Sequence, residues 1–475
     1  MTITTILAFA AIAFLLRVIF RGAGRGWALM MVSILAIYYL QPALPIRNLD
    51  FWLPTATLVL VICSWTLTAV PEEKSWKKSL PTMAALLGVV LLIALTRLFS
   101  LIGVLTPSRP PQFWQVGIAM AVGCLFFILL SLQRKPTAGL IVGGIFLLLG
   151  LLVVLKLPEL NLLVSGWLNK LSGGAVVIAR GLDIRWLGFS YIAFRLIHTL
   201  RDRQSGRLPA VTLQEYINYV IFFPAVSAGP IDRVERFIQD LRAPLPLNVE
   251  DFGEGGKRLV IGLFKKFAIA DSLAIFALNA TNTIQVKLTG WMWVLLYAYA
   301  LQIYFDFSGY TDIAIGLGRW LGFRLPENFE RPYLKPNLTL FWNSWHITLT
   351  QWFRAYFFNP VARWLRSVKR PIKPWVIIFL AQSATMLLIG LWHGITWNFV
   401  LWGAWHALGL FVHNRWSEWL KPHNAWFDRQ PRLKSTLSVV GMIATFNYVA
   451  LGWVWFALPS VQSSLTVFAK LLGVR

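Results

Sequence analysis

The chain has 475 residues, of which 57% are hydrophobic and only 13% are charged, and its mean hydropathy is +0.63. Soluble domains carry about 25% charged residues, so a water-soluble globular protein of this composition is excluded. The net charge of +24 favours basic loops beside anionic lipid over a nucleic-acid-binding surface. We therefore expect a lipid bilayer as the main partner and no nucleic acid.

Apolar segments of about 20 residues, long enough to cross the hydrocarbon core, recur along the chain. They predict an all-α polytopic membrane protein, a single integral membrane domain over 1–475, with about 11–13 transmembrane, re-entrant and interfacial helices. We expect the first segment to be an anchor rather than a cleaved signal. The firm spans are 3–20, 27–42, 51–70, 83–104, 113–132 and 137–156. Further candidates, several interrupted by polar residues or glycine, are 213–228, 257–280, 289–318, 374–392, 395–413 and 436–458.

Basic residues alternate between the loops of the first part. After the first, third and fifth spans come Arg21 and Arg25, then Lys74, Lys77 and Lys78, then Arg134 and Lys135. The intervening loops are sparser, with Arg47 on one and Arg97 and Arg109 near the other. Because cytoplasmic loops are enriched in Lys and Arg, this pattern predicts a multi-pass protein of the cell (inner or plasma) membrane with its N-terminus outside.

The character of the sequence changes along the chain. Residues 1–160 read as simple transmembrane helices, 184–410 as a motif-rich core, and 411–475 as C-terminal helices. An ionisable group at bilayer depth costs several kcal/mol unless it faces protein or water. Function is therefore expected in the second part. Cys63 and Cys124 lie inside apolar segments and are expected to be packing residues.

Two passages of that part combine apolar and ionisable residues. In 186–206, Arg195 and His198 interrupt an apolar face before a charged turn. In 222–237, proline and glycine break a helix just before Asp232 and Arg233. Breaks of this kind are tolerated where backbone lines a cavity.

The densest passage is 304–366. We expect Asp306 and Asp312, both on a helix, to pair with Arg319 or Arg324 before a break at Pro326. Residues 341–357 read as an amphipathic helix with His346 in its middle. Its tryptophans suit the headgroup boundary; they are Trp342, Trp345 and Trp352.

His393 lies between Trp392 and Gly394, at a hinge between two strongly apolar helices. No carboxylate is within helical reach, which is an unusual setting for a titratable group. A neutral imidazole in apolar surroundings has a pKa suited to a general base. We predict His393 as that base. His346, Asn343 or the indoles of Trp342 and Trp392 are candidates to orient a substrate or stabilise the oxyanion. His198, His406, His413 and His423 are expected to be structural or interfacial.

Four runs occur in order between 184 and 410: SAGPIDR, FDFSGYTDIAIGLGRWLGFRLPENFERPYL, FWNSWHITLTQWFR and GLWHG. Together they resemble the membrane-bound O-acyltransferase family, in the bacterial branch of alginate O-acetyltransferases and teichoic acid D-alanyltransferases. The resemblance implies a ring of helices around a central funnel. It also implies that His393 is catalytic and that His346 is the family's second histidine.

The resemblance further implies transfer of an acyl group, with acetyl preferred, from a cytoplasmic thioester to a hydroxyl of an exported cell-envelope polysaccharide. Acyl-CoA or an acyl-carrier phosphopantetheine would be the co-substrate, an extracytoplasmic acyltransferase would complete the transfer, and no bound cofactor or metal is expected. The alternative is D-alanyl transfer from a carrier protein to a teichoic acid. Two features depart from the family: Arg354-Ala355 replaces its usual Arg-Asp, and the first 160 residues match poorly.

Two other interpretations have less support. A membrane transporter would also use broken helices and buried charges, but the chain shows no internal repeat. A metal enzyme has little support, because no His or carboxylate pair in the chain shows metal-ligand spacing such as His-x-x-x-His. The basic run 366–374 is expected to lie near anionic lipid, or to dock an acidic acyl-carrier protein.

Overall fold

The computed structural model describes residues 1–20, 22–99, 105–131, 137–173, 183–246, 248–369 and 371–474. Its secondary structure over these residues is helical, apart from one isolated antiparallel bridge between Phe329 and Trp345. The predicted all-α class is confirmed. The predicted cytoplasmic residues Arg21, Arg134 and Lys135 lie outside the described residues.

The chain divides into two compact units. Unit 1 comprises Met1–Leu259 and Ile313–Leu325, and unit 2 comprises Val260–Asp312 and Pro326–Arg475. The division at 160 and 410 was expected from a change in sequence character, whereas these units are defined by which residues pack together, so that division stays a prediction.

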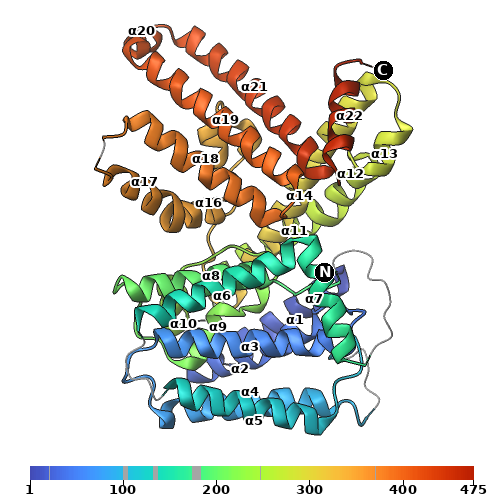
Figure 1. The fold of residues 1–475 in the computed structure, drawn as a ribbon, viewed down its shortest axis with the longest axis vertical. Helices are drawn as coiled ribbons and strands as arrows, with labels where there is room; N and C mark the ends of the chain where they lie inside the picture. Colours follow the sequence, from blue (N-terminus) through green and yellow to red (C-terminus); the bar gives the residue numbers. More distant parts are fainter. Residues whose placement is uncertain are drawn as a thin grey trace. The chain divides into compact units, whose positions relative to one another are not determined.

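Long helices dominate unit 1, where α3, α4 and α5 lie side by side (Figure 1). Its helices are α1 (Ile3–Ile19), α2 (Ala23–Tyr39), α3 (Leu49–Thr68), α4 (Trp76–Leu95), α5 (Phe113–Ser131), α6 (Ala138–Lys156), α7 (Pro158–Leu171), α8 (Phe189–Gln204), α9 (Leu213–Val220), α10 (Val234–Arg242) and most of α11 (Val249–Leu263).

Each of the six firm spans overlaps a helix. The span expected at 83–104 corresponds to α4, which begins at Trp76 and so includes Lys77 and Lys78 in its first turn; residues 100–104 of that span lie outside the described residues. The candidate span 213–228 is wrong. Helix α9 has only 8 residues, and a 3-10 turn over Phe223–Ala225 follows it at Pro224.

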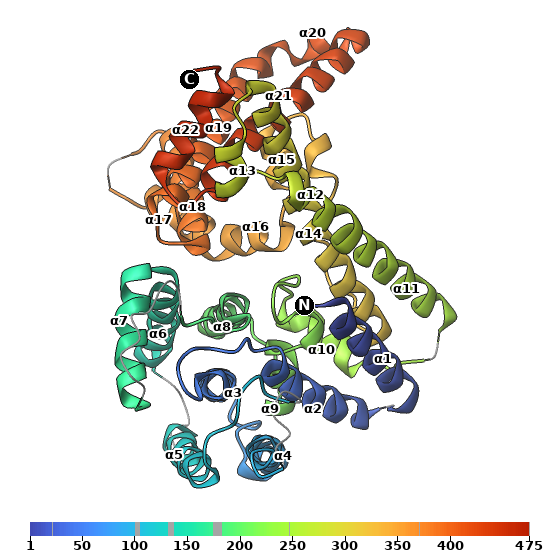
Figure 2. The same cartoon turned by 90° about the vertical axis from the view of Figure 1, so that its right-hand side faces the viewer.

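In unit 2, several short helices join a few long ones (Figure 2). They are a π-helix (Phe264–Ala270), α12 (Asp271–Phe276), α13 (Ala280–Gln285), most of α14 (Thr289–Trp320), α15 (Leu338–Trp342), α16 (Ile347–Phe353), a second π-helix (Arg354–Phe358), α17 (Asn359–Arg366), α18 (Pro374–His393), α19 (Trp397–Leu420), α20 (Asn424–Asp428), α21 (Pro431–Ala457) and α22 (Val461–Leu471).

Six described helices are long and apolar enough to cross a membrane: α3, α4, α5, α6, α18 and α21. Only 6% of the apolar window of α5 and 11% of that of α6 are buried inside the protein. Their exposed apolar side chains match a lipid-facing position, since lipid is the solvent that such a surface requires.

The carboxylates of α14 have partners other than the predicted arginines. Lys265 Nζ lies 2.6 Å from Asp312, and Lys266 is paired with Asp306. Arg319 instead lies 3.9 Å from Asp251. The lysines come from the π-helix Phe264–Ala270, an element that helical spacing along 304–331 could not reveal.

Candidate active site

His393 is the last residue of α18, and a close helix contact holds it. A Cβ on Gly390 would meet the Phe399 carbonyl oxygen at 2.3 Å, and one on Gly403 would meet that of Met386 at 2.7 Å. These glycines let α18 and α19 approach backbone to backbone. The end of α18, and with it His393, is therefore fixed relative to α19.

Aromatic rings surround the imidazole of His393, which is half-buried. Its ring centroid lies 4.6 Å from that of Trp392, 4.8 Å from Phe456 and 5.5 Å from Trp402. Phe399 adds a stacked ring at 5.9 Å. These four rings give the imidazole an aromatic surrounding.

His346 lies at a break between two helices, so the predicted continuous helix over 341–357 is wrong. Helix α15 ends at Trp342, and His346 is the N-cap of α16 with a left-handed backbone at φ 43°. The side chain is 3% exposed, and burial lowers the pKa of His346 to about 3. The imidazole is thus neutral at physiological pH.

Asn328, which is not among the predicted site residues, fixes this break. Its backbone carbonyl accepts a hydrogen bond from Ile347 N at 3.0 Å, and its side-chain oxygen accepts one from Thr348 Oγ1 at 2.6 Å. Glu330 N also donates to the Ser344 carbonyl at 3.0 Å. A fully buried asparagine that bonds both backbone and side chain is suited to hold an unusual backbone conformation.

The indole of Trp392 joins the two histidines. Its ring centroid lies 4.6 Å from His393 and 6.4 Å from His346, whose other flank packs on Phe307 at 4.7 Å. Three of the predicted site residues, which lie 46 and 47 positions apart in the chain, are thus brought into one cluster. We call Trp392, His393 and His346 the histidine pair site.

The other two predicted residues lie elsewhere. Trp342 packs against His406, with centroids 5.1 Å apart, and against Trp402. Asn343 is exposed and accepts a hydrogen bond from Arg354 Nη2 at 2.6 Å. Trp342 and Trp345 are 6% and 4% exposed and belong to an aromatic core beside the break at His346, so they pack inside the protein; their place at the headgroup boundary stays a prediction.

His406 is fully buried beside the histidine pair site. The indole of Trp402 contacts both His393, at 5.5 Å, and His406, at 4.8 Å. Neither ring nitrogen of His406 has a hydrogen-bond partner among the residues that the structure describes. A Cβ on Gly452 would lie 2.9 Å from its Nε2, so α21 closes over this ring.

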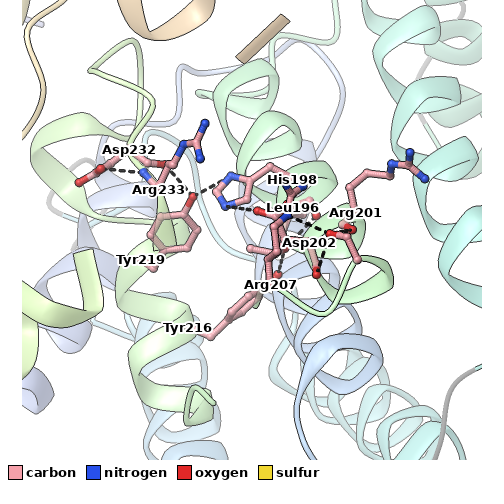
Figure 3. Close-up of polar contacts among 11 residues, drawn as sticks. Leu196, His198, Arg201, Asp202, Arg207, Tyr216, Tyr219, Asp232 and Arg233 are labelled. Carbon is pink, nitrogen blue, oxygen red and sulfur yellow. Dashed lines mark hydrogen bonds and ion pairs between the residues drawn. The ribbon is translucent and has the colours of Figure 1, made fainter. Parts of the chain in front are cut away.

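A separate polar network lies in unit 1, around His198 on α8 (Figure 3). Tyr219 donates its hydroxyl proton to the Asp232 carbonyl at 2.9 Å, and its oxygen lies 3.2 Å from His198 Nδ1. Asp202 lies 4.0 Å from His198 Nε2 and pairs with Arg207 at 2.8 Å. We call this set the His198 network.

Burial controls the ionisation of this network. It lowers the pKa of His198 to about 4, with Asp202 acting in the opposite sense. It also raises the pKa of Asp232 to about 6, against the effect of its ion-pair partner Arg236. Arg195 meanwhile donates to the carbonyls of Val220 and Ala225. The network therefore ties the broken segment after α9 to α8.

The sequence model of MBOAT, the membrane-bound O-acyltransferase family, matches residues 55–452. The chain belongs to the membrane-bound O-acyltransferase family. The matched range contains the His198 network of unit 1 and the whole histidine pair site of unit 2. The predicted family resemblance is confirmed, and with it the multi-pass membrane character.

Individual relatives in this family match a shorter part. The chain is 35% identical over 288 residues to a probable alginate O-acetylase of Pseudomonas aeruginosa, covering 60% of this chain and 51% of the relative. It is 32% identical over 267 residues to a peptidoglycan O-acetyltransferase of Helicobacter pylori, covering 55% and 47%. It is 28% identical over 285 residues to a teichoic acid D-alanyltransferase of Bacillus subtilis, covering 58% and 69%. The matches thus span about half the length of the two O-acetyl relatives.

This family member carries Ala355 where the family resemblance leads us to expect an aspartate. Arg354 opens the π-helix Arg354–Phe358, and its Nη2 donates a hydrogen bond to the Asn343 side-chain oxygen. Among the described residues, no group of three His, Cys, Asp or Glu side chains could hold a metal ion.

Proposed function

We propose that the chain is an acyltransferase that moves an acyl group from a thioester to a hydroxyl of an exported cell-envelope polysaccharide. His393 is the general base in this proposal. The observation that carries it is the histidine pair site, where two imidazoles contact one indole inside an aromatic surrounding. Family membership adds independent support.

The proposed chemistry balances without a cofactor. A nitrogen of His393 takes the proton of the acceptor hydroxyl while the oxygen attacks the thioester carbonyl carbon. The tetrahedral intermediate then collapses, the carbon–sulfur bond breaks, and the imidazolium returns the proton to the leaving thiolate. An ester and a free thiol result, and His393 is again neutral.

The proposed role of His346 follows from its rigid placement. A neutral imidazole carries one N–H, which can donate to the oxyanion or to the acceptor hydroxyl. Its left-handed backbone and the bonds to Asn328 hold the ring without any movement of α16. Preorganised donors of this kind stabilise developing charge at little reorganisation cost.

For the acyl group, acetyl is preferred over D-alanyl. Two of the relatives named above are described as O-acetylating enzymes, one for alginate and one for peptidoglycan. The third is described as a teichoic acid D-alanyltransferase. The proposed donor is a cytoplasmic acyl-CoA or acyl-carrier phosphopantetheine. An extracytoplasmic acyltransferase partner is proposed to complete the transfer to the polymer.

Transfer can be tested in vesicles of the native cell membrane, which hold the full chain together with its extracytoplasmic partner and acceptor, with labelled acetyl-CoA and a labelled D-alanyl carrier protein in separate arms. We expect label in the vesicle polysaccharide, and a loss of about 10³-fold in rate for His393→Ala, because a positioned general base contributes roughly 10²–10⁴-fold. The matched control is His423→Ala, since His423 is exposed and lies outside the histidine pair site.

The arms separate the possible failures. Label from one donor identifies the acyl group. Full activity of His393→Ala would remove this residue from the chemistry, and no transfer from either donor would refute the acyltransferase proposal.

A further inference from the structure

Unit 1 contains a cavity of about 480 Å³ at the beginning of α3 and α5. This volume lies in the range of pockets that bind small ligands, about 300–1,000 Å³. The polar lining of the cavity consists of two arginines, three amides, a serine and two indole side chains: Arg47, Arg97, Asn48, Gln112, Gln115, Ser172, Trp52 and Trp114.

Positive charge accumulates at this cavity without a neutralising acid. Partial desolvation and the positive charges of Arg109 and Arg47 lower the pKa of Arg97. Among the described residues, no Asp or Glu lines the cavity. Like charges held together repel one another, so the cluster is stabilised when an anion enters it.

The position of these arginines runs against the usual charge distribution of a membrane protein. They precede α3 or lie between α4 and α5, whereas Lys74, Lys77 and Lys78 follow the other end of α3. Basic residues are enriched on one face of the membrane only. Arg47, Arg97 and Arg109 therefore lie at the sparsely charged ends of the helices, where topology gives no reason for them.

Local bonds hold several of the lining groups in place. Arg97 Nη1 donates to the Pro110 carbonyl at 2.5 Å, which leaves its other N–H groups for a further acceptor. The side-chain oxygen of Gln115 accepts from Gln112 N at 3.0 Å, and Trp114 donates its indole N–H to the Gln112 side chain. Trp114 remains 59% exposed, so a large part of its surface is open to a ligand.

We propose that this cavity binds an anionic sugar unit of the acceptor polymer, with its carboxylate or phosphate on Arg47 and Arg97. Guanidinium groups match both anions with paired N–H donors. The amides would bond sugar hydroxyls, and the indole faces would pack on the apolar face of the ring. This inference rests on the proposed function for the role of the bound glycan, and it places acceptor recognition in unit 1.

Equilibrium binding by the detergent-solubilised full chain tests the proposal, with three probes of similar length. They are a short uronic acid oligomer, a glycerol phosphate oligomer and a neutral glucose oligomer. We expect at least one anionic probe to bind, more weakly as salt is raised, and the neutral probe to bind far less. The anionic arm that binds distinguishes a carboxylate polymer from a phosphate polymer.

Variants localise the binding. Arg47→Gln should weaken the Kd for the anionic probe about tenfold, which corresponds to roughly 1.4 kcal/mol, and Arg109→Gln, outside the lining, should have a smaller effect. The matched control Lys77→Gln removes an exposed charge at the other end of α3 and should leave the Kd unchanged. Equal binding of charged and neutral probes, no binding of any probe, or an unchanged Kd for Arg47→Gln would overturn the proposal.

The binding measurement does not depend on transfer. His393→Ala should bind the anionic probe as the parent chain does. If the parent binds but transfers nothing, the acyltransferase proposal fails and the cavity remains a glycan site. If transfer occurs but no probe binds, the cavity is not the acceptor site.

Discussion

The histidine pair site and the His198 network use buried imidazoles in opposite ways. His393 is half-buried among aromatic rings at a helix end, and His346 occupies a left-handed break. His198 instead lies inside a regular helix, 1% exposed, between a tyrosine hydroxyl and a carboxylate. The first arrangement leaves a half-buried imidazole among aromatic rings, and the second uses one to join backbone segments.

The two settings differ in what surrounds the imidazole and in the backbone that carries it, and this difference separates the proposed catalytic histidines from His198. Both settings cost free energy, since each removes a polar ring from water. In the His198 network the surrounding hydrogen bonds and ion pairs offset the cost. At the histidine pair site, His346 has in addition a left-handed backbone conformation, a feature that is common at functional sites.

The largest expected effect concerns transfer. His346→Asn should lower the rate of acyl transfer about 100-fold, because it removes a preorganised donor while asparagine tolerates the left-handed backbone. His198→Gln should leave the rate per folded molecule unchanged. Initial rates in the vesicle assay, normalised to folded protein, check this, and a similar loss in both variants would erase the distinction between the two regions.

The second effect is a pH dependence of stability that His198 causes. Its folded-state pKa is lowered from 6.5 to about 4, so its contribution is fully present above pH 6.5 and is lost as pH falls toward 4. Between pH 7 and pH 5 the parent should lose about 2 kcal/mol from this group. Thermal unfolding of the full chain in detergent at both pH values, compared with His198→Gln, measures it.

Asp232 acts in the opposite sense. Its folded-state pKa is raised from 3.8 to about 6, so proton uptake below pH 6 stabilises the folded protein. This contribution is present in the parent and in His198→Gln, and the difference between them isolates the histidine. Identical pH dependence of the two proteins would show that His198 does not titrate between pH 7 and pH 5.

The smallest expected effect concerns the left-handed break at His346. Asn328→Ala removes the acceptor of Thr348 Oγ1 and should lower kcat about tenfold with little change in KM, since it displaces His346 without touching substrate. Rescue by Asn328→Asp, which keeps an oxygen acceptor, would support a positioning role. A change confined to KM would contradict it.

Much of the fold was predictable from local pattern. Apolar segments predicted helices at α1, α2, α3, α5 and α6 within a few residues, because helix length in a bilayer follows from its thickness. The Trp-His-Gly and Trp-His-Ile passages predicted His393 and His346 as candidates. Asn328 carried no comparable signal. It lies between Glu327 and Glu330 in a polar stretch after Pro326, where an asparagine resembles an ordinary loop residue.

The sequence by itself determined the solvent of this protein, its helical class, its family and the identity of its two candidate histidines, because composition and short motifs are local properties. Only the tertiary structure decided that Trp392 joins those histidines and that Lys265 and Lys266 pair with the carboxylates of α14. It also decided that arginines from separate loops meet at one cavity. These are contacts between distant segments, and neither hydrophobic period nor spacing encodes which segments become neighbours.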